Sequence, residues 1–347
     1  MTIEVAAHSS LDAFDLPEWR ALFERDPNSH IFATPEWNRL WWEEFGAGNE
    51  LFVLDVRRGS DPLAIVPLYR TEQDGRRILR FVGGIDLTDY LGAICTAEDR
   101  GYAARALLDW LIREEIEWDE FDAHNMPVPF GFGEALVDWS DRLGFEFTLD
   151  QEETSAILVL AADWDAYLAR LGSKNRHELR RKRRRLGRDY PDVRFRTTTS
   201  ETLERDLELF VDMHRGAEGL KGHFMRPEIA TFFERIARDF QPRGWLRLDF
   251  MEIDERAVAS TFGFQLGHTF YLYNSAYLPE VARLSPGLVL VSELVKNAIA
   301  DDHTRIFDFL RGPERYKYQL GSQAVPLNNV RVLNRGTDRV RAPSTMG

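Results

Sequence analysis

The sequence predicts a mixed α/β (α+β) protein made of two tandem units, each with a mostly antiparallel sheet flanked by helices. Its 347 residues exceed the usual size of a single hydrophobic core. Apolar residues make up 44% of the chain and aromatic residues 12%, which is a globular composition. The same order of elements also occurs twice, so we expect an N-terminal unit over residues 1–150 and a C-terminal unit over 151–347.

The first elements of the repeat are a helix and a hairpin. "PEWNRLWWEEF" (35–45) and "PEIATFFERIARDF" (227–240) both begin with Pro-Glu and continue with aromatic residues at helical spacing. "ELFVLDVRRGSDPLAIVPLYR" (50–70) and "WLRLDFMEIDERAVASTFGFQL" (245–266) each read as apolar strand, polar turn and apolar strand. We therefore expect a helix and then a hairpin in each half, with the aromatic residues of the helices in the core.

The remaining elements follow in the same order. A third strand, "DYLGAIC" or "HTFYLYNSAYL", comes before an apolar helical run that Gly101 or Gly287 opens. The strands "EFDAHNMP" (120–127) and "IFDFLRGP" (306–313) match at an offset of 186 residues, the same offset that separates the two glycines. Chance similarity between two mixed domains stays open, but the shared order favours a duplication with two separate sheets.

A basic segment interrupts an acidic chain. The formal charge of the chain is −13, yet residues 173–188 contain nine Lys or Arg and one Glu. A helix that begins at Ser173 and ends at Gly187 would expose most of these cations to solvent, paired with carboxylates. Nucleic-acid binding is the least favoured interpretation, because no aromatic residues are interleaved and no second basic patch exists. The third interpretation places an anionic substrate in a cleft between the units, against Lys174, Arg176 and Arg180.

Several kinds of site are not predicted. A single cysteine, Cys95, excludes an internal disulfide framework and a cysteine-rich zinc site. The eight histidines show no metal-ligand spacing and there is no Gly-x-Ser-x-Gly motif, so we expect neither a metal nor an enzyme nucleophile. No apolar run approaches 18 residues, and the first ten residues do not resemble a signal peptide. We expect a cytoplasmic protein without a membrane span.

Three segments resemble a known family: "IFATPEWNRLWWEEFG", "LARLGSKNRHELRRKRRRL" and "FDFLRGPERYKYQLG". In this order they are similar to the bacterial BioF2-like or cellulose-biosynthesis (CelD-type) acetyltransferases, which are related to FemAB-type peptidyltransferases. The resemblance implies two tandem units of the GNAT acetyltransferase fold. It also implies transfer of an acyl group from acetyl-CoA, or another acyl-CoA, to an amine or hydroxyl of a small-molecule, glycan or peptide acceptor.

The helix that begins near residue 286 is the candidate donor site. A helix N-terminus offers unpaired N–H groups to a phosphate, and "RLSPGLVL" supplies a capping residue, a proline and a glycine there. The corresponding start in the first half carries Glu98 and Asp99, which would repel a phosphate. The resemblance implies that this turn holds the coenzyme A pyrophosphate, although the family pattern Gln/Arg-x-x-Gly-x-Gly/Ala is only partly kept. We assign the donor to Arg283, Ser285, Pro286, Gly287 and Leu288.

The last strand motif carries the candidate catalytic residues. The resemblance implies that Tyr316 and Lys317 lie close to the reacting carbonyl, where the Lys317 ammonium would stabilise an oxyanion. A surface position for Lys317 fits the sequence equally well. Asp308 and His223 are the candidates for the general base. The residues assigned to the acceptor are Lys174, Arg176, Arg180, His223, Tyr273 and Arg311.

Two other functions stay open. One is a FemAB-type peptidyltransferase whose donor is an aminoacyl-tRNA, in which case tRNA would be the nucleic-acid partner. The other is a binding protein without catalytic activity. Stabilisation by acyl-CoA, by tRNA or by neither would discriminate among the three.

Overall fold

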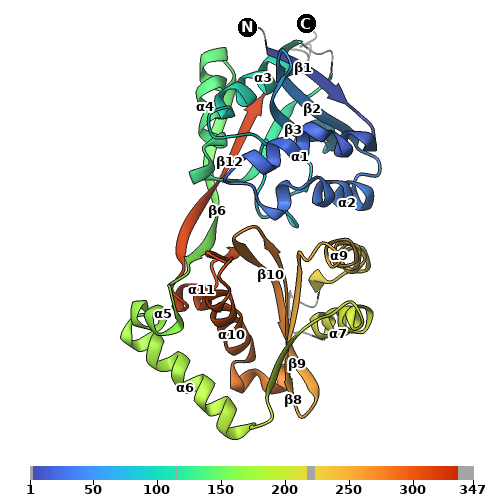
Figure 1. The fold of residues 1–347 in the computed structure, drawn as a ribbon. Coiled ribbons are helices and arrows are strands. Elements are labelled where there is room, and N and C mark those ends of the chain that lie inside the picture. The colour runs from blue at the N-terminus through green and yellow to red at the C-terminus, as the bar shows by residue number, and fades with distance from the viewer. Residues whose placement is uncertain (1–2, 114–115, 217–222, 335–347) are drawn as a thin grey trace, which may run out of the picture. The chain divides into compact units, whose positions relative to one another are not determined.

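The protein forms two compact units. The computed structural model describes residues 3–113, 116–216 and 223–334. Unit 1 contains the chain up to Thr154 and the described residues from Val325 on, and unit 2 runs from Ser155 to Ala324. The sequence places the whole C-terminal part in the second unit, whereas the last strand of the chain lies in unit 1. The fold class expected from the sequence is confirmed, since each unit has a mixed sheet flanked by helices (Figure 1).

Unit 1 has antiparallel strands followed by one parallel strand. Its strands are β1 (Ile3–His8), β2 (Glu50–Arg58), β3 (Asp61–Gln73), β4 (Arg76–Phe81), β5 (Glu120–Pro127) and β12 (Gln323–Leu333). They are hydrogen-bonded in this order, with β4 and β5 parallel and the other neighbours antiparallel. A mostly antiparallel sheet is what the sequence predicts, but the strand that follows β3 is β4 and not the expected segment 89–95.

Helices cover both faces of the unit 1 sheet (Figure 1). They are α1 (Pro17–Arg25), α2 (Pro35–Phe45), α3 (Arg100–Arg113) and α4 (Phe132–Leu143), with short 3-10 helices η1 (Leu11–Asp15), η2 (Ile31–Ala33) and η3 (Val128–Phe130). The predicted helix at 35–45 begins as its sequence suggests, because the Trp37 N–H donates to Thr34 Oγ1 at 3.2 Å and Pro35 occupies the first position. Trp37 and Trp41 are buried, as expected.

Unit 2 repeats this topology. Its strands are β7 (Arg194–Thr197), β8 (Leu246–Ile253), β9 (Arg256–Leu266), β10 (Thr269–Tyr277) and β11 (Ile306–Arg311), together with the part of β6 (Glu146–Val159) from Ser155 on. They are hydrogen-bonded in the order β6-β11-β10-β9-β8-β7, and β10 and β11 are the parallel pair. The predicted hairpin at 245–266 corresponds to β8 and β9.

The helices of unit 2 lie on opposite faces of its sheet (Figure 1). They are α5 (Trp164–Arg170), α6 (Ser173–Asp189), α7 (Leu203–Arg215), α9 (Pro227–Phe240), α10 (Pro286–Ala300) and α11 (Arg315–Gln319), with the 3-10 helix η4 (Pro279–Leu284) before α10. On the α7 and α9 face, Phe210 and Phe233 pack on Phe262 of β9. On the other face, α10 packs on Phe270 and Phe307 of the parallel strands.

The last strands of the two units are exchanged. β6 follows α4 of unit 1 but pairs with β11, where Leu158 lies opposite Phe307. β12 follows α11 of unit 2 but pairs with β5, where Val332 lies opposite Phe121. The strand order is therefore continuous through β12 and β6, and the expectation of two separate sheets is wrong. The apolar alternation of a strand fixes which side chains are buried, but not which neighbour the strand pairs with.

Candidate functional site

The two parallel strands of unit 2 separate after a short pairing. β10 pairs with β11 over three residues, Thr269–Tyr271 against Ile306–Asp308. A bulge then interrupts β10 between Leu272 and Asn274, and Leu310 in β11 takes a positive φ of 59°. Bulges bend a strand and turn its side chains to new directions. The space beyond the paired segment becomes a cavity.

This cavity brings together most of the predicted donor residues and one predicted catalytic residue. It has a volume of about 360 Å³. Its lining comes from β10, the start of α10 and the residues after β11, namely Ser275, Tyr277, Ala282, Ser285, Pro286, Gly287, Leu288, Val291, Glu314 and Tyr316. Arg283, the fifth residue assigned to the donor, is exposed and does not line the cavity.

The start of α10 presents unpaired backbone donors to the cavity. Ser285 adopts a left-handed conformation, with φ 56°, and its side chain makes no capping hydrogen bond, contrary to the role expected from the sequence. The first intrahelical bond runs from the Val289 N–H to the Ser285 oxygen at 3.1 Å. The N–H groups of Gly287 and Leu288 therefore have no acceptor within the helix, and they are available to an anion together with the positive end of the helix dipole.

The space where a side chain of residue 287 would begin is not closely packed by the protein. A Cβ added there would meet only Tyr277 Cδ1, at 3.7 Å, which is an ordinary contact. Its φ is not among the positive values of the chain. Glycine is thus not required by the fold at this position, whereas close approach of a ligand to the backbone does require it.

Tyr316 supplies a neutral phenol to the cavity. It lies on α11, with its ring in edge contact with Phe309 at 6.3 Å between centroids. Burial, and then the charge of Glu314, raise the pKa of the Tyr316 hydroxyl above its usual value. The group is therefore protonated at neutral pH and can donate a hydrogen bond or a proton.

Lys317 lies beside the cavity but is directed into the protein. Its Nζ donates to the carbonyl oxygens of Leu310 at 3.1 Å, of Gly312 at 3.3 Å and of Arg311, and it pairs with Glu314 Oε2 at 2.9 Å. An ammonium has three hydrogens to donate, and these four acceptors occupy them. The side chain is 4% exposed. The oxyanion role expected from the sequence does not fit this geometry, which instead holds the chain after β11.

Asp308 stabilises the same bend from the other side. Its Oδ1 accepts the Leu310 N–H at 2.8 Å and the Ser155 hydroxyl at 3.4 Å, and the side chain is buried. A carboxylate so placed offsets the unfavourable positive φ of Leu310. Asp308 does not line the cavity, so the structure does not bring it to the reaction as a base.

The other predicted acceptor residues do not meet in this cavity. Tyr273 faces the α9 side of the sheet, where its ring stacks on Phe233 at 5.3 Å. His223 is exposed at the edge of the described chain, and Arg311 contributes its carbonyl to the Lys317 cluster. In their place the cavity contains Ser275 and Tyr277, which sequence reasoning missed, and Glu314, which the motif around Tyr316 could have indicated.

Helix α6 carries the predicted basic segment and continues two residues past Gly187. Its buried side is formed by Leu179 and Leu186, which are each 3% exposed. Most of its arginines pair locally: Arg181 with Glu178, Arg183 with Glu293 of α10, and Arg185 and Arg188 with Asp189.

The three cations of α6 assigned to the acceptor differ from one another. Arg176 donates from Nη1 to the carbonyls of Leu168 and Ala169, each at 3.4 Å. Lys174 and Arg180 are exposed. They form the accessible basic surface of the N-terminal half of α6.

Two further searches of the described ranges gave no site. No three His, Cys, Asp or Glu side chains within residues 3–113, 116–216 and 223–334 are grouped to hold a metal ion. In the same ranges, no helix combines the length and apolar character needed to cross a membrane.

Part of the chain is similar to a known domain family. Residues 173–318 match the family described as acetyltransferase (GNAT) domain. The match begins at α6 and ends in α11, so it contains both the start of α10 and Tyr316. It lies within unit 2 and covers less than half of the chain. No curated protein matches the chain by sequence.

Solved structures match the fold over nearly the whole chain. The structure of FemX has a TM-score of 0.66 at 12% identity, covering 98% of this chain and 100% of FemX. A conserved protein of unknown function from Bacteroides thetaiotaomicron has a TM-score of 0.60 at 14% identity, covering 95% and 100%. The C-terminal domain of a putative lysylphosphatidylglycerol synthetase from Agrobacterium fabrum has a TM-score of 0.57 at 10% identity, covering 95% and 94%. At these identities the likeness shows the shared fold alone.

Proposed function

We propose that this protein transfers an acyl group from an acyl-CoA to an amine or hydroxyl acceptor, and that unit 2 binds the donor. The observation that carries the proposal is the cavity lined by the end of β10, the start of α10 and the residues after β11. It places the free N–H groups of Gly287 and Leu288 and the phenol of Tyr316 around one space of about 360 Å³. A phosphate-binding helix start and a proton donor are the two parts that this reaction needs from the donor side.

The reaction can be written with these residues. The donor pyrophosphate accepts hydrogen bonds from the start of α10, and the thioester extends along β10 past Ser275. The acceptor nitrogen or oxygen attacks the thioester carbonyl carbon, a new C–N or C–O bond forms, and the C–S bond breaks. Tyr316 gives its proton to the departing thiolate. Glu314, which lines the same cavity, takes the proton that the acceptor loses.

For the acceptor we propose an anionic molecule that meets the exposed cations of α6. Lys174 and Arg180 are exposed near the start of this helix, whereas the cations toward its end are paired with Asp189. Two exposed cations that have no carboxylate partner among the described residues raise the local concentration of an anionic substrate. In this proposal unit 1 has a structural or acceptor-side role.

Substitution of Gly287 tests the donor site. Gly287→Ala should weaken acetyl-CoA binding about tenfold, because the new Cβ occupies the space of the phosphates, and Gly287→Asp should weaken it further by adding a charge. The unfolding midpoint of the Ala variant should not fall, because alanine is a better helix former than glycine and meets no close neighbour. Gly187→Ala is the matched control, since a Cβ added at that helical glycine would meet nothing within 4 Å. Calorimetric titration that finds full acetyl-CoA affinity in both Gly287 variants would place the donor elsewhere.

The second candidate is transfer of an aminoacyl group from an aminoacyl-tRNA. The exposed cations of α6, Lys174, Arg180 and Arg184, favour it because they offer a polyanion a continuous basic surface. Thermal unfolding with acetyl-CoA, with longer acyl-CoAs and with charged tRNA separates the candidates. Stabilisation by acyl-CoA alone supports the first proposal, and stabilisation by tRNA alone supports the second. Stabilisation by neither would indicate a binding protein without this activity.

A further inference from the structure

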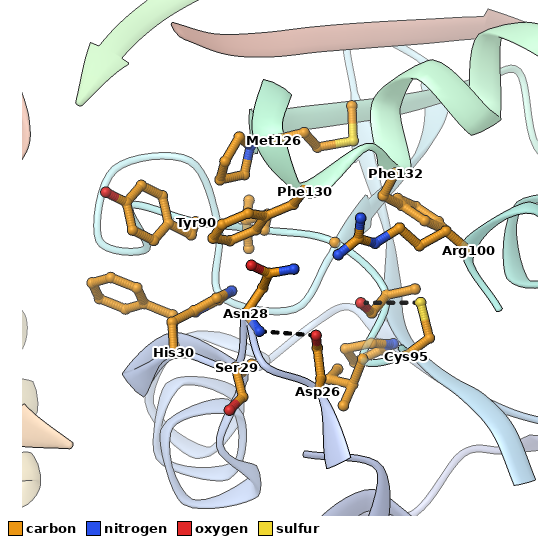
Figure 2. Close-up of a pocket in the computed structure, with 18 of the residues that line it drawn as sticks. Asp26, Asn28, Ser29, His30, Tyr90, Cys95, Arg100, Met126, Phe130 and Phe132 are labelled. Carbon is orange, nitrogen blue, oxygen red and sulfur yellow. Dashed lines mark hydrogen bonds between the residues drawn. The ribbon is translucent and has the colours of Figure 1, made fainter. Parts of the chain in front are cut away.

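Unit 1 has its own cavity where its parallel strands separate. β4 pairs with β5 over two residues, Ile78 and Leu79 against Glu120 and Phe121. The cavity lies beyond this pairing, and it is lined by the loop after α1, the segment 90–95, the start of α3 and the turn after β5 (Figure 2). It corresponds in topology to the donor cavity of unit 2, but its volume is only about 40 Å³.

Two buried nitrogen atoms of residues that line this cavity have no hydrogen-bond partner within the described part of the chain. They are Nη2 of Arg100, at the first position of α3, and Nδ1 of His30. Figure 2 shows the Arg100 guanidinium directed toward the middle of the cavity. Buried polar groups in native proteins are almost always hydrogen-bonded, so an unpaired guanidinium nitrogen beside a cavity indicates a missing partner there.

The charges around the cavity restrict what that partner can be. Arg100 brings one positive charge and the Asp26 carboxyl, which accepts the Asn28 N–H at 3.0 Å, brings a negative one. Burial lowers the pKa of His30 to about 3, so its ring is neutral. Burial likewise raises the pKa of Cys95 to about 12, so its thiol is protonated. A simple anion would pair with Arg100 but would be repelled by Asp26, whereas a molecule carrying both charges complements both groups.

The rest of the lining combines apolar side chains with the polar Asn28, Ser29 and Asn38, and the space is small. Phe130, Phe132 and Met126 form one wall (Figure 2). A water needs about 10–15 Å³ of such volume, so a cavity of about 40 Å³ has room for a ligand larger than one water, but only for a small one. Glycine is the smallest amino acid, and alanine adds one methyl group.

We propose that this cavity binds a small α-amino acid, with the carboxylate on Arg100, the ammonium toward Asp26 and the carbon atoms against the aromatic wall. The site is separate from the donor cavity of unit 2 and does not depend on acyl transfer. In unit 2 the proposed donor binds where the parallel strands separate, at a phosphate-binding helix start. In unit 1 the corresponding space has the charged pair Arg100 and Asp26 instead.

Equilibrium dialysis of the full-length protein against radiolabelled glycine and alanine tests the proposal. We expect saturable binding at one site per chain. Unlabelled glycine should displace the label, whereas acetate or methylamine, each carrying one of the two charges, should displace it at least tenfold less well. Glycine betaine, which has both charges but a bulky trimethylammonium, should not compete.

Three variants connect the binding to this cavity. Arg100→Met keeps an unbranched side chain but removes the guanidinium, and it should reduce glycine affinity at least tenfold. Asp26→Asn should reduce it by a similar factor. Arg105→Met, on the same helix with a side chain that is 50% exposed, should leave the affinity unchanged. If Arg100→Met fails to fold, Asp26→Asn and the competition series still decide the question.

Three results would overturn the proposal. Absence of saturable glycine binding would mean that water alone fills the cavity. Equal competition by acetate would mean a site for simple anions. Full glycine affinity in both cavity variants would place the amino acid elsewhere on the protein.

Discussion

Lys317 is the residue whose geometry departs most from its sequence-based role, and Lys317→Met tests the difference. The change keeps the aliphatic length but removes an ammonium that three carbonyls, of Leu310–Gly312, and the Glu314 carboxylate surround. Loss of one partner from a buried ionic cluster destabilises a protein by about 3–5 kcal/mol. Because Glu314 is half-exposed and can be rehydrated, we expect the lower end, about 3 kcal/mol.

This loss is large enough to measure by thermal unfolding. For a unit the size of Ser155–Ala324, 1 kcal/mol shifts Tm by about 2–4 °C, so Tm should fall by roughly 6–12 °C. Lys296→Met is the control, because the Lys296 side chain is 46% exposed and its contact with Glu293 is 3.8 Å long, so the change should cost under about 0.5 kcal/mol. An unchanged Tm in Lys317→Met, together with loss of acyl transfer, would refute the structural role and restore a catalytic one.

Three further predictions concern other parts of the protein. Burial would lower the pKa of His124, but hydrogen bonds to Asp122 and Glu152 outweigh burial and raise the pKa to about 9. The stability that the His124 imidazolium contributes should therefore be complete below about pH 6.5 and lost as pH rises through 9. Urea unfolding midpoints measured across this pH range test the prediction, and His124→Gln should abolish this pH dependence. Cys95, with a pKa of about 12, should react with a thiol reagent at pH 8 only after unfolding; rapid reaction of the native protein would contradict its burial. Replacing Lys174 and Arg180 by Gln should raise the acceptor KM and leave Tm nearly unchanged, whereas steep salt dependence of the loss would point to a nucleic acid instead.

The sequence by itself determined the local elements and the position of the helix start at which we propose the donor site. Pro35 and Pro227 mark helix starts, and the apolar pattern of 245–266 specifies a hairpin, because caps, turns and periodicity depend on neighbours within a few residues. The turn before Gly287 could be identified in the same way, since a phosphate-binding helix start is a local feature. Its acidic counterpart, Glu98 and Asp99, indicated that unit 1 has no such phosphate site.

Only the tertiary structure decided which strands pair and which side chains reach the cavities. Because β6 and β12 are exchanged, Leu158 pairs with Phe307, which lies 149 residues further along the sequence. Local sequence patterns do not predict a pairing at that distance. The bulge in β10 brings Ser275 to the cavity and turns Tyr273 to the other face, which strict alternation would not allow. The Lys317 ammonium likewise donates to carbonyl oxygens of the strained bend instead of facing a substrate. A buried ammonium needs hydrogen-bond acceptors, and only the folded backbone decides where these lie.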